Sequence, residues 1–146
     1  MMNLLMRSLP RWVLIVIVIV SFIGFLDATY LTIQHYNDSI LPCVVFEGCE
    51  QVTNSQYSTI FNIPISFFGV IYYLIIFLSA IIFWDTKNVK TLLVLAYLPI
   101  AGFVISMFLL YLQLFVIKAL CTYCVVSVAT STILFGLGLR IIKVRP

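Results

Sequence analysis

The four cysteines of this 146-residue chain form two pairs whose spacing suits thiol–disulfide chemistry. Cys121 and Cys124 stand three residues apart, so on a helix both side chains lie on one face and can pair. If the helix begins at Cys121, the partial positive charge at its N-terminus favours a thiolate there. Cys43 and Cys49 lie in a different segment, where a bridge would close a small ring that contains Gly48. We therefore expect the two pairs to pass electrons between them by thiol–disulfide exchange.

The composition of the chain places these cysteines in a membrane protein. Hydrophobic residues make up 64% of the chain, charged residues 9%, and the mean hydropathy is +1.21. Soluble domains are about 45–50% apolar and about 25% charged. A soluble domain of this size could not bury so much apolar surface. The net charge of +3 is scattered rather than gathered in one basic patch, which argues against nucleic-acid binding.

Four apolar stretches are long enough to cross a bilayer as helices, which takes about 20 residues. They cover residues 12–33, 63–84, 91–117 and 121–139. The backbone must satisfy its own hydrogen bonds in lipid, so we expect helices even where β-branched residues are dense. The sequence therefore predicts an all-α integral membrane protein. We expect one four-helix domain over residues 1–146, with a long outer loop between the first two helices and no fused thioredoxin-like domain.

The uneven distribution of lysine and arginine orients these helices. Basic residues precede the first stretch and follow the last, and Lys87 and Lys90 separate the second from the third. Residues 33–62 contain no lysine or arginine. We therefore expect both termini in the cytoplasm and all four cysteines on the outer face, where disulfides persist.

Two other interpretations of the cysteines remain open. Four cysteines on one face could bind zinc, although the spacing of Cys43 and Cys49 exceeds that of the usual zinc knuckle. The two pairs could also be structural disulfides in a membrane scaffold that is not an enzyme. The redox relay is the interpretation that uses the different depths of Cys121 and Cys124, and it needs no metal ion.

The order of these features resembles the vitamin K epoxide reductase family, with four helices, a loop cysteine pair and a C-x-x-C motif opening the last helix. Residues 49–64 are similar to the family's segment that runs from a cysteine through a serine to phenylalanine–glycine–isoleucine–proline, with Asn62 where glycine is usual. Residues 68–73 continue the similarity into the second helix, and residues 30–32 look like the bacterial branch. The resemblance covers roughly residues 20–135.

The resemblance implies an enzyme that passes electrons from thiols to a lipid quinone and so supports disulfide bond formation in exported proteins. The quinone would be ubiquinone, menaquinone or vitamin K, and the electron donor a separate thioredoxin-fold (DsbA-like) protein. By position, Cys43 would receive the electrons and Cys49 would pass them to Cys121. Cys124 would face the quinone. The resemblance also implies the bacterial cytoplasmic (inner) membrane.

Further residues are candidates for holding the quinone. Ser55 matches the family's serine near the quinone, where its hydroxyl could hydrogen-bond a carbonyl oxygen; on the residues alone it could equally cap a helix. A quinone site must be mostly apolar with a few polar anchors. The aromatic candidates for lining it are Phe61, Phe68 and Tyr72.

Two ionisable residues near the outer end of the first helix are candidates for moving protons. Asp27 lies within an apolar stretch, where a charged residue is a functional candidate by default, although an interfacial position with access to water is the alternative. His35 is the only histidine of the chain. It could aid proton release, or it could be a solvated loop residue.

Overall fold

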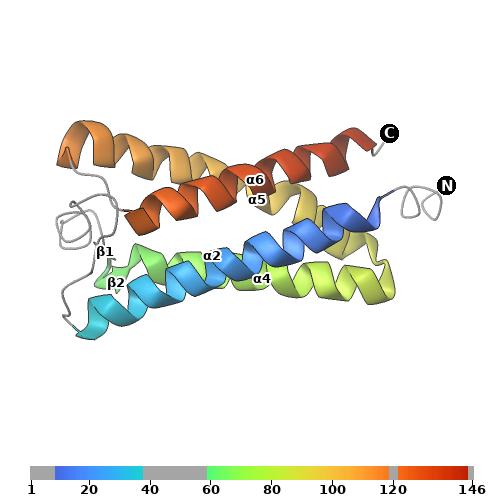
Figure 1. Cartoon of the computed structure of the whole chain (residues 1–146), viewed down its shortest axis with the longest axis horizontal. Helices are drawn as coiled ribbons and strands as arrows, with labels where there is room; N and C mark the ends of the chain where they lie inside the picture. Colours follow the sequence, from blue (N-terminus) through green and yellow to red (C-terminus); the bar gives the residue numbers. More distant parts are fainter. Residues whose placement is uncertain (1–8, 38–58, 119–121, 145–146) are drawn as a thin grey trace.

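The computed structural model describes residues 9–37, 59–118 and 122–144. Within these ranges, four long helices run side by side (Figure 1). They are α2 (Arg11–Asn37), α4 (Ile65–Thr86), α5 (Val89–Tyr111) and α6 (Thr122–Val144), and the π-helical segment η1 (Leu112–Ile117) extends α5. All four are long and apolar enough to cross a membrane, α5 together with most of η1. The predicted all-α bundle of four membrane helices is therefore confirmed.

The ends of the helices differ from the predicted ends by a few residues. The first helix continues to Asn37 and the last to Val144, because helical hydrogen bonding does not stop where the apolar composition stops. The second helix begins later than predicted. Its expected first residues, Ile63–Pro64, form strand β2, which pairs antiparallel with β1 (Thr59–Ile60).

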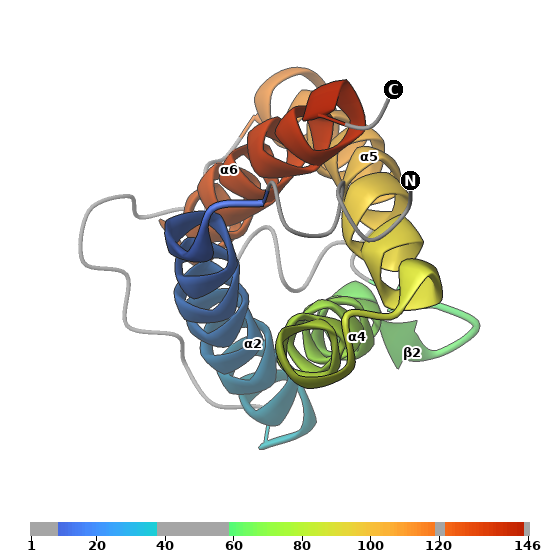
Figure 2. The ribbon, with the colours of Figure 1, turned by 90° about the vertical axis from the view of Figure 1, so that its right-hand side faces the viewer.

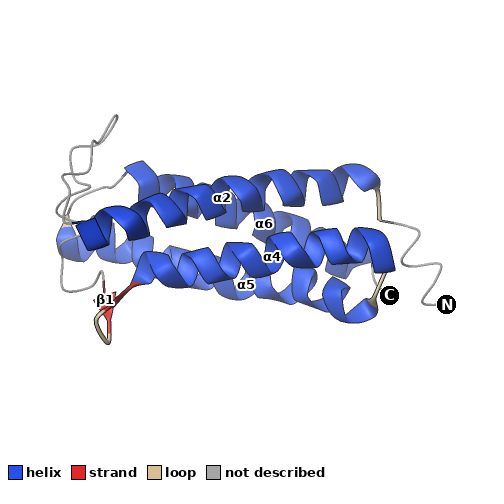
Figure 3. Cartoon of the chain, turned by 90° about the horizontal axis from the view of Figure 1, so that it is seen from below, coloured by secondary structure: helices blue, strands red, loops and turns tan. Residues whose placement is uncertain are grey.

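The β1–β2 hairpin leads directly into α4 (Figure 3). The two residues between the strands, Phe61 and Asn62, have φ values of 52° and 64°. Two-residue hairpins need such left-handed residues to match the twist of the strands, and asparagine adopts this conformation readily. Pro64 is the N-cap of α4 with φ −65°, the value that its ring fixes. The hairpin thus ends at a residue that can begin the helix.

The four helices form a ring when the bundle is viewed along its length (Figure 2). Helix α2 packs against α4 and α6, and α5 packs against the same two helices. This arrangement leaves α4 diagonal to α6. The start of α2, the α4–α5 turn and the end of α6 lie at one end of the bundle, and the β hairpin and the start of α6 lie at the other (Figure 1).

The outer surface of the bundle is apolar, unlike that of a soluble protein. Large apolar side chains such as Val104 and Phe115 point outward and are exposed. The buried polar side chains of the described residues are Ser21, Ser79, Ser106, Gln113, Thr130 and Ser131. Lipid solvates apolar side chains well, whereas polar side chains in a membrane need hydrogen-bond partners, from the protein interior or, as for the exposed Thr132, from the backbone of their own helix. The buried serine, threonine and glutamine side chains therefore mark helix faces that turn inward.

Candidate functional site

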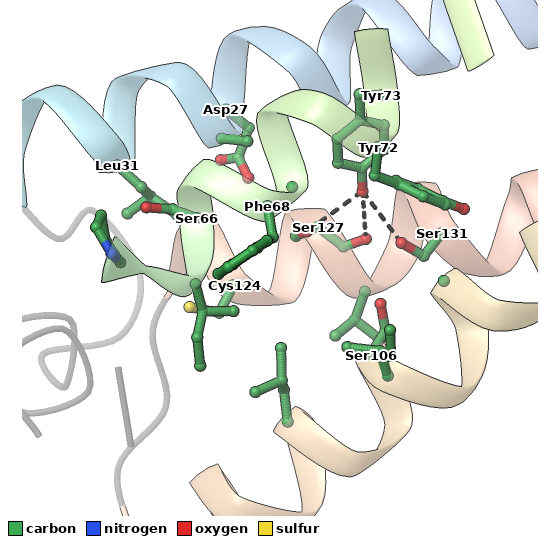
Figure 4. A pocket seen from close by; sticks show the side chains of 18 of the residues that line it. Asp27, Leu31, Ser66, Phe68, Tyr72, Tyr73, Ser106, Cys124, Ser127 and Ser131 are labelled. Atoms are coloured by element: carbon green, nitrogen blue, oxygen red, sulfur yellow. Dashed lines mark hydrogen bonds between the residues drawn. The ribbon is translucent and has the colours of Figure 1, made fainter. Parts of the chain in front are cut away.

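A cavity of about 260 Å³ lies inside the half of the bundle that carries the β hairpin, and all four helices line it (Figure 4). Its wall is largely apolar. Its polar lining residues are Asp27, His35, Ser66, Tyr72, Tyr73, Ser106, Gln113, Cys124, Ser127 and Ser131. A concave, mostly apolar site with a few polar groups is the usual form of a small-molecule site.

Cys124 is the one predicted relay cysteine that falls within the described residues, and it lines this cavity. It lies in the first turn of α6 and is partly buried. Ser127 and Ser131 follow it at helical spacing and line the cavity on the same face of α6 (Figure 4). The other three cysteines, Cys43, Cys49 and Cys121, lie outside the described residues. The predicted Ser55 lies outside them too.

The structure places the three aromatic candidates differently. Phe68 and Tyr72 stand four residues apart on α4 and both line the cavity. Phe61 sits in the turn of the β hairpin, where 94% of its surface is exposed, and it is not among the residues that line the cavity.

The two ionisable candidates both line the cavity from α2. The carboxylate of Asp27 points from α2 toward α4, on the side where Phe68 lies (Figure 4). His35 lies two turns further along the same helix. Between them, the Thr32 hydroxyl donates a hydrogen bond of 2.9 Å to the Ser66 hydroxyl, which joins α2 to α4 beside the cavity. The structure therefore brings both candidates into one site with Cys124.

Tyr73 closes the inner end of the cavity. Its side chain is 1% exposed and crosses the middle of the bundle from α4 to the diagonal helix α6. Its hydroxyl lies 2.7 Å from the Thr130 hydroxyl and 3.1 Å from that of Ser131, and it donates to the carbonyl oxygen of Ser127 at 3.0 Å. Gly24 on α2 provides the space, because a Cβ there would overlap the tyrosine ring.

Tyr72 forms the side of the cavity toward α5. Its ring packs against Gly102, where a Cβ would overlap the ring atoms. The Tyr72 hydroxyl is buried, and Ser131 on α6 is its polar neighbour. The lining residues Phe68 on α4 and Ala101 and Ile105 on α5 are exposed. Both helices therefore contribute apolar side chains to this part of the cavity wall.

Gln113 is a lining residue that the sequence interpretation missed. It is the second residue of η1, and only 4% of its surface is exposed. Its side-chain oxygen Oε1 is buried without a hydrogen-bond partner among the described residues. The sequence carries one signal that could have identified it: Gln113 is the only residue with an amide side chain between Asn88 and Lys118.

Comparison with known proteins agrees with the arrangement of the helices. The family model described as the vitamin K epoxide reductase family matches residues 15–139. This range includes every cavity-lining residue and all four cysteines. No curated protein matches the chain.

Proposed function

Because the chain belongs to the vitamin K epoxide reductase family, whose members are multi-pass membrane oxidoreductases that act on thiols and quinones, we propose that it passes electrons from a dithiol protein to a lipid quinone. The proposed route runs from a thioredoxin-fold partner to Cys43 and Cys49, then to Cys121 and Cys124, and then to the quinone. The partner delivers its electrons by thiol–disulfide exchange through a mixed disulfide.

The observation that carries this proposal is the position of Cys124 in the wall of a largely apolar cavity between the membrane helices. A quinone is dissolved in the membrane, so a thiol that reduces it must be reached from the membrane. Phe68 and Tyr72 offer flat apolar surfaces for the quinone ring. The predicted Ser55 would add a hydroxyl for one carbonyl oxygen.

The proposed reaction balances without a further reactant. The thiols of Cys121 and Cys124 lose two electrons and two protons, and one disulfide bond forms between their sulfur atoms. The quinone takes up both electrons and both protons, and it leaves as a quinol. A dithiol of the partner then reduces the new disulfide through Cys43 and Cys49.

We further propose that Asp27 helps to carry a proton from the thiols to the quinone oxygen. A carboxyl group within reach of a reacting group is a common general acid or base. Asp27 and Cys124 line the same cavity from adjacent helices. His35, at the outer part of the same cavity wall, is the candidate for exchanging protons with water.

The arrangement of charges supports an orientation in the bacterial inner membrane. Arg11, Lys87, Lys90 and Lys143 belong to the end of the bundle that holds the start of α2, the α4–α5 turn and the end of α6. Cytoplasmic loops carry such an excess of basic residues. With this end in the cytoplasm, Cys124 lies toward the outer face of the membrane, the side on which exported proteins are oxidised.

The test measures loss of quinone absorbance by purified protein in detergent, with ubiquinone, menaquinone and vitamin K as separate acceptors. The electron donor is either a reduced thioredoxin-fold protein or dithiothreitol. We expect Cys121→Ser and Cys124→Ala to abolish turnover with both donors. Cys43→Ala and Cys49→Ala should abolish turnover with the protein donor and retain it with dithiothreitol, because the small thiol can reduce the inner pair directly.

Failure of the wild-type protein to reduce all three quinones with either donor would reject the proposal. Zinc analysis of the reduced protein, and the count of cysteines that resist reduction, would then distinguish a zinc site from structural disulfides. Equal loss of turnover in all four variants with dithiothreitol would reject the proposed order of the two pairs.

A further inference from the structure

The side-chain oxygen Oε1 of Gln113 is a buried polar atom in the cavity for which the described residues supply no hydrogen bond. Its Oε1 is buried, and the residue as a whole is 4% exposed. An unsatisfied polar group inside a membrane protein costs free energy, because no bulk water is present to replace the missing partner. A leucine at this position would avoid the free-energy cost of burying a polar group. We therefore expect the amide to bind a partner that enters the cavity.

The local backbone directs this side chain inward. Gln113 is buried in the π-helical segment η1. The next three residues of the same segment, Leu114, Phe115 and Val116, are exposed. A π-helical turn interrupts the register of an α-helix, and such turns occur frequently at functional sites. The π-helical turn thus places one polar residue facing inward in a segment whose following residues are apolar and face outward.

A second buried polar group faces the same cavity. The Tyr72 hydroxyl is also buried, with Ser131 on α6 as its polar neighbour in the protein. Tyr72 lies on α4 and Gln113 on the extension of α5, and both line the cavity. Two polar groups on two helices can fix the orientation of an otherwise apolar ligand.

The chemistry of these two groups fits a quinone in both of its redox states. A quinone carries carbonyl oxygens, which accept hydrogen bonds, and the quinol carries hydroxyl groups, which donate them. The tyrosine hydroxyl can donate to a carbonyl. A side-chain amide has both an N–H donor and an oxygen acceptor, and a half-turn about its last bond exchanges them.

We infer that the Gln113 amide is a ligand-anchoring group that hydrogen-bonds one oxygen of the quinone or quinol, with the Tyr72 hydroxyl as a second anchor. This inference rests on the proposed function and adds residues that decide which ligands the cavity prefers. It predicts that Gln113 recognises the oxygen atoms on the quinone ring and not the apolar shape of the ring.

The test measures binding and turnover separately on the purified full chain in detergent. Binding is measured in a background with all four cysteines replaced by serine, because menadione adds covalently to thiols, and the readout is the stabilisation against heat that a ligand gives. The two probes are menadione, a naphthoquinone, and 2-methylnaphthalene, which has the same ring and methyl group without the oxygens. For the wild type we expect menadione to stabilise the protein at a concentration at least tenfold lower than 2-methylnaphthalene does.

The decisive variant is Gln113→Leu, which keeps approximately the size of the side chain and removes its polar atoms. We expect it to raise KM for the quinone about five- to tenfold, the effect of one hydrogen bond. We expect kcat to change less than KM. The variant should also bind menadione and 2-methylnaphthalene with nearly equal affinity.

Gln34→Leu is the matched control. Gln34 also has a buried Oε1 without a described partner, but it lies on α2 and is not among the residues that line the cavity. Its removal should leave KM and the preference for menadione at their wild-type values. If Gln34→Leu raised KM as much as Gln113→Leu does, the specific role of Gln113 would be rejected.

Two other results would overturn the inference and leave the proposed function standing. If Gln113→Leu were more stable to heat than the wild type and kept the wild-type KM, the Gln113 amide would hydrogen-bond only water and not the quinone. If the variant kept the wild-type preference for menadione, other groups would recognise the oxygens. A wild type that neither binds nor reduces any quinone would instead reject the proposed function.

Discussion

The hydroxyl of Tyr73 on α4 lies 2.7 Å from the hydroxyl of Thr130 on α6, although these helices stand diagonally in the bundle. The contact joins two helices that share little other surface. It also separates the cavity from the apolar core beyond it, where Ile76, Ala80 and Phe83 are buried. One tyrosine therefore both supports the bundle and ends the site.

Tyr73→Phe is expected to lower the free energy of unfolding by about 1 kcal/mol, because hydrogen bonds between membrane helices contribute about that much. The hydroxyls of Thr130 and Ser131 lose their partner across the bundle. Thermal unfolding in detergent measures the change. Tyr97→Phe is the control, since Tyr97 is 53% exposed on α5. Equal unfolding temperatures for the two variants would contradict the structural role given to Tyr73.

Gly102→Ala is expected to lower the free energy of unfolding by about 1–3 kcal/mol, the usual cost of overfilling a packed interior. The added Cβ would overlap the Tyr72 ring and force it to move. The displaced ring should also weaken quinone binding. At Gly136 a Cβ would meet no atom within 4 Å, so Gly136→Ala should leave stability unchanged or raise it. Chemical or thermal unfolding of both variants tests the pair, and a stable Gly102→Ala with normal quinone binding would refute the contact.

Asp27→Asn is expected to lower kcat for quinone reduction at least tenfold with little change in KM, because the amide cannot exchange a proton. Asp27→Glu should recover part of the activity. Asp85→Asn, at the exposed far end of α4, is the control and should behave as the wild type. Full activity of Asp27→Asn would remove Asp27 from the proton path and leave the cysteine route untouched.

Quinone in the cavity should protect Cys124 from alkylation. In a variant with Cys43, Cys49 and Cys121 replaced by serine, saturating 2,3-dimethyl-1,4-naphthoquinone, which has no free ring position for thiol addition, should slow labelling of Cys124 at least fivefold. A parallel variant carries Cys124→Ala and a cysteine at Val104, which is 61% exposed on the outside of α5. Labelling at this second site should proceed at the same rate with or without this naphthoquinone. Unprotected labelling of Cys124 would place the quinone elsewhere.

The sequence predicts the four helices well, because the thickness of the bilayer sets their length and lipid sets their composition. It predicts their inward faces poorly. Each helix is apolar on all sides, so hydrophobic periodicity carries no signal about which side packs. The usable signal was the placement of polar side chains, such as Ser127 and Ser131 following Cys124 at helical spacing.

Parts of the site depended on geometry that no local pattern carries. Phe68, Tyr72, Asp27 and His35 were selected from the sequence, and the structure gathers them around one cavity. Gln113 was missed because a window average hides one amide among apolar neighbours, and because the π-helical turn that redirects it has no simple sequence signature. The assignment of these residues to a quinone remains a prediction.

The short connection between α4 and α5 has a consequence for how the protein is made. Only Lys87, in the left-handed conformation, and Asn88, the N-cap of α5, separate the two helices. A turn of this length is too short to form a separate water-exposed loop if the two helices entered the membrane one after the other. We therefore expect the two helices to enter the bilayer together as a helical hairpin, which would bring Phe68, Tyr72 and Gly102 together at insertion.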